Sequence, residues 1–259
     1  MDTSCPAPFI DLAGKLAETS GEIVRRYFRT PVAVDSKADQ SPVTVADREA
    51  ETAMRALIEA ECPDHGIIGE EFGALRPTAD YVWLLDPIDG TKSFITGKPV
   101  FGTLIALACR GEPILGIIDQ PVLGERWLGV KGRATTLNGA PARVRPCAGL
   151  GEAMLYAASP HMFEGADADA FARLSQRVRH PLYGADCYAY GLLASGYTDL
   201  VVEASLEAHD YAAPAAIVEG AGGVVTDWRG APLRLGSDGR VIAAGDEKIH
   251  AEALELLGG

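Results

Sequence analysis

The sequence predicts an α+β fold, arranged as a layered αβαβα sandwich, in which N-terminal helices cover an antiparallel meander sheet and an α/β half follows. Three observations carry this prediction. Residues 9–60 show the spacing of two amphipathic helices, and residues 67–130 hold short apolar runs separated by turn signals. After about residue 150, helical and strand-like segments alternate, which favours helices packed on a sheet with parallel pairs.

Two helices are expected before the sheet. Residues 9–28 carry apolar side chains at roughly helical spacing, and a second helix is expected from Thr44 to about Ala60. The segment from Val32 to Pro42 between them is polar and is interpreted as a loop or a short hairpin. Asp47 follows Thr44 by three residues, which is the spacing of a helix capping arrangement.

The strands of the meander are expected at Ile67–Ile68, Tyr81–Leu85, Thr103–Ala108, Ile114–Ile118 and Arg126–Val130. In the second half, helices are expected over 167–178, 187–195, 210–220 and 246–257, with strands near Met154–Tyr156, Asp199–Glu203, Val224–Thr226 and Val241–Ala243. We therefore expect two sub-domains, residues 1–150 and 151–259, with the active site in a cleft at their junction.

Composition and charge limit the classes of function. The chain has 259 residues, 47% of them apolar, and a formal net charge of −13. Such a charge repels nucleic acid and anionic lipid, so neither is expected as a partner. The five cysteines form no C-x-x-C pair and are interpreted as free thiols. The first residues lack the pattern of a secretory signal, and no apolar run is long enough to span a bilayer, so a cytoplasmic location is expected.

Four acidic positions mark the chemistry. Glu70 follows the run at Ile67–Ile68, and Asp86 and Asp89 follow the run at Tyr81–Leu85. Asp210 stands at the start of the predicted 210–220 helix. Taken singly, these acids are ordinary: Asp-Pro and Asp-Gly form turns, Asp210 could be an N-cap, and Glu70 could lie in a solvated loop.

Strand ends and helix starts can bring these carboxylates together. Carboxylates placed so close repel one another unless cations neutralise them. The potential ligands are all hard oxygens, with no His or Cys among them, which favours magnesium over zinc or copper. Gly90 and Thr91 then open a short predicted helix, whose free N–H groups would make an anion site. Metals beside an anion site indicate phosphoryl chemistry, in which two cations clamp a phosphate and activate a water.

Together these positions match a known pattern. The run 85–91 (LDPIDGT), with Gly69-Glu70-Glu71 upstream and His209-Asp210 downstream, resembles the inositol monophosphatase family. The resemblance extends over nearly the whole chain and includes 41–47 (SPVTVAD), 184–203 and 219–223 (EGAGG). The run 90–107 (GTKSFITGKPVFGTLIAL), followed by 116–121 (GIIDQP), is most similar to the histidinol-phosphatase branch of that family.

The resemblance implies a role for each position. One magnesium ion would be held by Glu70, Asp86 and the carbonyl of Ile88, and a second by Asp86, Asp89 and Asp210. A third, more weakly bound ion would be supported by Glu70. Thr91 and Asp47 would orient and deprotonate the attacking water, with Glu70 also in the catalytic set. The N–H groups of Gly90 and Thr91 would hold the phosphate, and Gly184, Ala185, Asp186 and Glu203 would face the leaving group. The family also implies a homodimer.

The leaving-group side of the site indicates the substrate. Histidinol phosphate carries an ammonium and an imidazole, and a pocket containing Asp186 and Glu203 would suit such a cation. Asp186 could equally cap the helix that follows it. Pro214, four residues after Asp210, departs from the family pattern, which more often has an ordinary helix former there. Its ring would crowd the carbonyl of Asp210 and affect how this ligand is oriented.

Four hypotheses follow. The first is a magnesium-dependent histidinol-phosphate phosphatase of histidine biosynthesis. The second is a relative acting on inositol phosphates, fructose bisphosphate or 3′-phosphoadenylates. The third is a metal-binding regulatory protein without catalysis. The fourth is a metal-free hydrolase with paired carboxylates. Four clustered acids and a flanking hydroxyl suit bound cations better than this mechanism.

Overall fold

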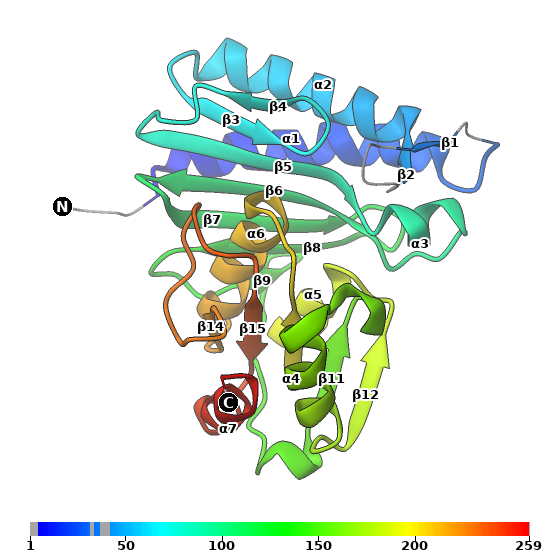
Figure 1. The fold of residues 1–259 in the computed structure, drawn as a ribbon. Coiled ribbons are helices and arrows are strands. Elements are labelled where there is room, and N and C mark those ends of the chain that lie inside the picture. The colour runs from blue at the N-terminus through cyan, green and yellow to red at the C-terminus, as the bar shows by residue number, and fades with distance from the viewer. Residues whose placement is uncertain (1–4, 32–33, 37–41, 259) are drawn as a thin grey trace.

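The computed structural model describes residues 5–31, 34–36 and 42–258. Two long helices, α1 (Ala7–Tyr27) and α2 (Val45–Glu61), lie side by side on one face of the larger sheet (Figure 1). Both predicted helices are confirmed. Between them, β1 (Val34–Ser36) pairs with β2 (Pro42–Thr44) in the predicted hairpin, of which residues 32–33 and 37–41, including Ser41 of the family motif, lie outside the described residues.

The larger sheet has eight strands in the order β10-β9-β8-β7-β6-β5-β3-β4. Their bounds are β3 (Gly66–Gly69), β4 (Gly73–Leu75), β5 (Tyr81–Asp89), β6 (Gly102–Cys109), β7 (Glu112–Gln120), β8 (Glu125–Val130), β9 (Thr136–Leu137) and β10 (Ala140–Pro141). The predicted antiparallel meander is confirmed from β5 to β8, and the two-residue strands β9 and β10, which were not predicted, extend it. The edge differs from a simple meander: β3 runs parallel to β5, because the short strand β4 reverses the chain between them.

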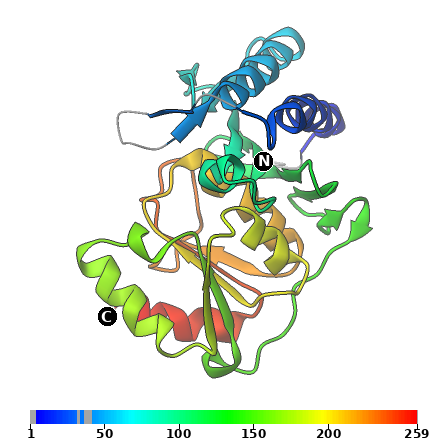
Figure 2. The same cartoon turned by 90° about the vertical axis from the view of Figure 1, so that its right-hand side faces the viewer.

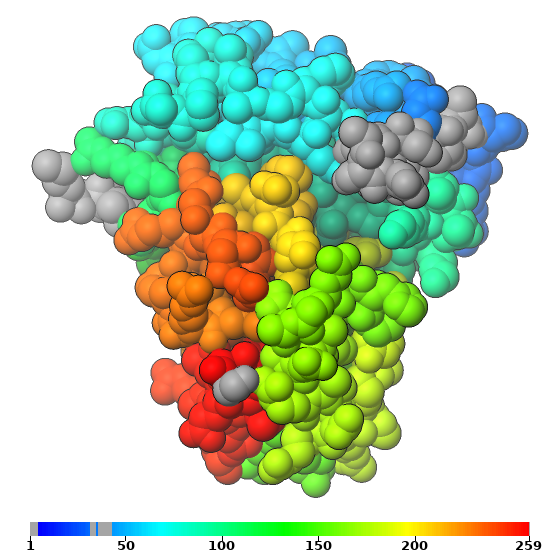
Figure 3. Space-filling model, viewed as in Figure 1, coloured from blue at the N-terminus to red at the C-terminus, as the bar shows by residue number. Residues whose placement is uncertain are grey.

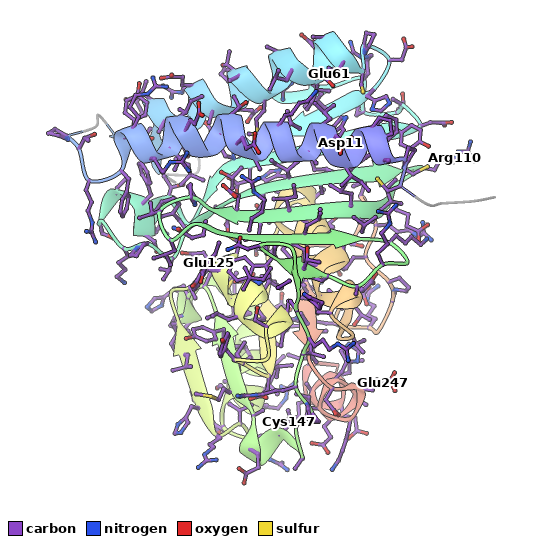
Figure 4. All side chains as sticks on the ribbon, turned by 180° about the vertical axis from the view of Figure 1, so that it is seen from behind. Asp11, Glu61, Arg110, Glu125, Cys147 and Glu247 are labelled. Carbon is purple, nitrogen blue, oxygen red and sulfur yellow. The ribbon has the colours of Figure 1, made fainter. Side chains whose placement is uncertain are left out.

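Two helices from the second half cover the other face of this sheet. Helix α6 (Ala208–Gly220) packs on β6, β7 and β8, and α5 (Tyr188–Ala194) lies beside it. Gly116 and Gly129 make the close approach of α6 possible, since a Cβ at either position would overlap the backbone of α6. At the start of β8, Glu125 points toward α5 (Figure 4), whose Tyr188 hydroxyl donates to its carboxylate.

The second sheet has five strands in the order β12-β11-β13-β15-β14. Their bounds are β11 (Met154–Ala157), β12 (His180–Tyr183), β13 (Leu200–Glu203), β14 (Val224–Thr226) and β15 (Val241–Ala244). The predicted parallel pairs are found where β11 meets β12 and β13, whereas β15 is antiparallel to both its neighbours. Helices α4 (Gly165–Ser175) and α7 (Glu247–Leu257) pack together on the outer side (Figure 2).

These layers confirm the predicted αβαβα arrangement. The second half forms a narrower body below the broad first half (Figure 3). One hydrophobic core joins the two, because it includes Leu84 and Leu104 of the first sheet, Tyr190 and Tyr211 of the middle helices, and Ala243 of the second sheet. A functional division after residue 150 stays a prediction. Within the described residues, no helix combines the length and the apolar character needed to cross a membrane.

Candidate metal centre and catalytic site

Strand β5 brings two of the predicted ligands to one place. The strand runs past the predicted end at Leu85 to Asp89, and its pairing with β6 shifts register between Asp86 and Asp89. Pro87 lies within this shift, and a proline cannot donate to a ladder, so irregular pairing is expected there. The backbone N–H of Ile88 donates to Oδ1 of Asp86 at 2.9 Å. The irregular end of β5 therefore fixes how the Asp86 carboxylate is turned.

Helix α6 supplies the third carboxylate. Asp210 is the third residue of α6, and the N-cap is Glu207, so Asp210 is not the N-cap itself. Its Oδ2 accepts a hydrogen bond from the N–H of Glu207 at 2.7 Å, which completes a capping box. Pro214 stands inside the helix, where it removes the N–H that would pair with the carbonyl of Asp210. The carboxylate is thus held by the capping box rather than by the interrupted helical turn.

Three of the predicted ligands converge. One carboxylate oxygen from each of Asp86, Asp89 and Asp210 lies within 4.8 Å of the other two, a grouping that suits a bound cation. Glu70, in the turn after β3, lies outside this closest group. It is nevertheless near enough to raise the pKa of both Asp86 and Asp210. All four acids therefore share one electrostatic centre.

The electrostatics of this centre favour neutralisation. Burial, followed by the charges of Glu70, Asp89 and Asp210, raises the pKa of Asp86 well above its usual range. Burial, followed by the charges of Asp186, Asp210 and Glu203, does the same for Asp89. Buried carboxylates of like charge stay ionised only when cations offset them. The donor set, which is oxygen throughout, fits a hard divalent cation.

Asp47 and Thr91 lie on the flank of this centre. Oδ2 of Asp47 accepts hydrogen bonds from both the N–H and the hydroxyl of Thr44, as the capping arrangement predicts. Its Oδ1 is buried without a hydrogen-bond partner among the described residues. Burial raises the pKa of Asp47, and the charge of Glu70 adds to this effect. Thr91 opens α3 (Thr91–Ile95), and its hydroxyl donates to the carbonyl of Ile88 at 3.1 Å.

The predicted leaving-group residues adjoin the same centre. Asp186 is not the cap of α5, since the N-cap is Cys187 and none of the side chains that the structure describes caps that helix. Instead, Oδ2 of Asp186 accepts a hydrogen bond from the Ser93 hydroxyl of α3 at 3.1 Å. The next N–H, that of Cys187, donates to Oδ2 of Asp89 at 2.5 Å. The 184–187 turn, in which Gly184 has φ 80° and Asp186 φ 45°, therefore binds the second half of the chain to the metal-ligand strand.

Glu203 ends β13 and is buried. Its carboxylate accepts hydrogen bonds from the Tyr190 hydroxyl at 2.8 Å and from the N–H of Ala158 at 3.0 Å. Burial is the main reason that its pKa rises to about 7. Tyr190 and Ser93 were not predicted as site residues. Their only signal was position, since Ser93 follows the LDPIDGT motif and Tyr190 lies one turn after Asp186.

Comparison with known proteins supports the resemblance that the motifs indicated. The model of the inositol monophosphatase family matches residues 6–258. The chain belongs to the inositol monophosphatase family. Members of this family are phosphatases and are generally metal-dependent, so phosphoric monoester hydrolysis is the activity supported at this level.

Several relatives are similar over most of their length. The bifunctional phosphatase IMPL2 of Arabidopsis thaliana, a chloroplastic protein, is 51% identical over 96% of this chain and 75% of its own. A histidinol-phosphatase of Chlorobaculum parvum is 36% identical over 91% of this chain and 92% of its own. The solved structure of an inositol monophosphatase from Zymomonas mobilis is 48% identical, with a TM-score of 0.91 over 98% of this chain and 100% of that one.

Proposed function

We propose that this protein is a magnesium-dependent histidinol-phosphate phosphatase of histidine biosynthesis, which converts L-histidinol phosphate and water into L-histidinol and phosphate. The observation that carries the proposal is the position of two further acids, Asp186 and Glu203, against the three-carboxylate centre. Both are close enough to Asp89 for their charges to raise its pKa. A leaving group that bears an ammonium and an imidazole would be attracted to such acids.

Magnesium ions fit the donor set of the centre. Glu70, Asp86 and the carbonyl of Ile88 would hold one ion, and Asp86, Asp89 and Asp210 a second. Glu70 would also support a third ion. When bound, these ions would clamp the phosphate and supply an activated water together with charge neutralisation.

The remaining roles fall to the chain itself. Asp47 has one oxygen fixed by Thr44 and the other without a hydrogen-bond partner among the described residues, and its raised pKa makes it a stronger base toward the attacking water. The Thr91 hydroxyl, held at the carbonyl of Ile88, would orient the attacking water toward Asp47. The N–H groups of Gly90 and Thr91 would bind the phosphate oxygens, and the turn at Gly184 and Ala185 would border the leaving group.

A substrate panel tests the proposal. Phosphate release is measured from histidinol phosphate, inositol 1-phosphate, fructose bisphosphate and 3′-phosphoadenylate, with magnesium and with a chelator. We expect histidinol phosphate to be preferred and the chelator to abolish turnover. The Asp186→Ala variant should lose kcat/KM for histidinol phosphate by more than tenfold relative to inositol phosphate. Asp11→Ala, on the exposed side of α1, is the matched control. Equal losses on both substrates would contradict the pocket argument.

An inositol-1-monophosphatase is the second candidate, because the 48% identical structure from Zymomonas mobilis bears that description. The same panel separates the two, since this alternative predicts that inositol phosphate is preferred and that Asp186→Ala leaves its turnover intact. A regulatory protein without catalysis predicts no phosphate release from any substrate. The proposed homodimer is tested by sedimentation of the purified protein.

A further inference from the structure

Glu51 is a buried acid that the proposed reaction does not use. It lies on α2 one turn after Asp47, and its side chain is fully buried. Its Oε2 accepts a hydrogen bond from the N–H of Glu71 at 2.7 Å. Its Oε1 accepts from the N–H of Phe72 at 3.2 Å and from Nε of Arg55 at 2.7 Å. Arg55 also donates to the carbonyl of Gly73.

These contacts hold the turn between β3 and β4 that carries Glu70. On one side, the N–H of Glu70 donates to the carbonyl of Leu85, the residue before Asp86, at 3.1 Å. On the other side, Glu51 accepts the next two N–H groups of the turn. The turn that carries Glu70 is therefore attached at Glu70 to the strand that bears Asp86, and at the next two residues to the helix that bears Asp47.

The residue before Glu70 shows how closely the carboxylate fits. A Cβ at Gly69 would overlap the carboxylate of Glu51. The space beside the turn is thus occupied by an acid of α2, and glycine is the residue that leaves room for it. Arg55 pairs with the acid, so that its charge is offset although it is buried.

We propose that Glu51 is a positioning residue that fixes the Glu70 turn and thereby sets the affinity of the site for magnesium. The inference rests on the proposed role of Glu70 as a metal ligand. Residues that orient metal ligands typically contribute about 10–100-fold to metal affinity. Glutamine has the same shape, but in either orientation its amide nitrogen would face a donor from which one carboxylate oxygen now accepts, so it cannot reproduce all the contacts.

Magnesium binding to the metal-free protein, measured by titration calorimetry at 20 °C, tests the inference. We expect Glu51→Gln to weaken binding by about 10–100-fold. Glu59→Gln, an exposed acid on the same helix, is the matched control and should bind as the wild type does. A purely structural role would lower the melting temperature of Glu51→Gln and leave its magnesium affinity unchanged, and that result would overturn the inference.

Two further measurements keep the test decisive. Gly69→Ala displaces the same carboxylate, so its loss of affinity and that of Glu51→Gln should not add in the double variant. In the metal-free wild type, the amides of Glu71 and Phe72 should be protected from hydrogen exchange; unprotected amides would refute the contacts without any variant.

The outcome is separate from that of the proposed function. A wild type that binds magnesium and hydrolyses no substrate, with Glu51→Gln binding it weakly, would end the proposed activity and leave the positioning role in place. If the wild type hydrolyses histidinol phosphate and Glu51→Gln binds magnesium normally, the proposed activity stands and the positioning role is refuted.

Discussion

Replacing Asp89 by asparagine should stabilise the metal-free protein while removing its response to magnesium. One carboxylate oxygen from each of Asp86, Asp89 and Asp210 lies within 4.8 Å of the other two. Asparagine keeps an oxygen that can accept the hydrogen bond from the N–H of Cys187, so this contact is retained. The substitution therefore removes charge and little else.

The distances set the magnitude. At an effective dielectric constant of about 20, two unit charges 4.8 Å apart repel by about 3 kcal/mol, and Asp89 takes part in two such pairs. Protonation relieves part of this repulsion, because the pKa values of Asp86 and Asp89 are raised. We expect a gain of about 1–3 kcal/mol in the free energy of unfolding at pH 8. At about 2–4 °C for each kcal/mol in a chain of this size, the melting temperature should rise by about 2–12 °C.

The gain should depend on pH. A carboxylate whose pKa is raised by folding binds more protons in the native state, so the stability that it contributes is present at low pH and is lost as pH rises through the folded pKa. The metal-free wild type should therefore fall further below Asp89→Asn at pH 8 than at pH 5. Magnesium should reverse the order at pH 8, because it binds only the folded wild type with high affinity.

Thermal unfolding at pH 5 and pH 8, with a chelator and with magnesium, measures these differences. Asp11→Asn removes one exposed charge from α1 (Figure 4) and controls for net charge. The electrostatic reasoning would be refuted if metal-free Asp89→Asn were no more stable than the wild type at pH 8. It would also be refuted if the gain in melting temperature were equal at both pH values.

Three other outcomes follow from the fold. Burial lowers the pKa of His250, which shares a hydrogen bond with Thr226. The stability that the neutral His250 ring contributes is present above its unfolded pKa of about 6.5 and is lost as pH falls. His250→Gln should therefore flatten the decline in urea midpoint from pH 7 to pH 5. Gly116→Ala should lower the free energy of unfolding in urea by about 1–3 kcal/mol, whereas Gly14→Ala, which has open space on α1, should raise it by about 0.5–1 kcal/mol. Equal effects of the two substitutions would contradict the close packing of α6 on Gly116. Thr44→Ala should lower stability by about 1 kcal/mol, since it removes the cap of α2, and an unchanged melting temperature would count against the cap.

The helices were predictable because their signals are local. Apolar spacing and the Thr44–Asp47 cap placed α1 and α2 within a few residues of their observed bounds. The short strands β4, β9, β10 and β12 were missed. β9 and β10 have two residues each, β4 has three and begins at a glycine, and β12 is largely exposed, so none shows the alternation of a buried strand. The parallel pairing of β3 with β5 is a long-range contact that no local pattern encodes.

The sequence by itself determined the family and the residue types of the site, because the LDPIDGT motif and the flanking acids lie in short segments whose order is readable along the chain. Only the tertiary structure decided which acids meet. Asp210 reaches Asp86 because α6 packs on β7 where Gly116 leaves room for it. Glu51 looked like an ordinary helix acid, although it shares the inward face of α2 with Met54 and Ile58. Its partners include the backbone N–H groups of Glu71 and Phe72, twenty and twenty-one residues away. A backbone donor leaves no mark on the sequence, because every residue type except proline carries one.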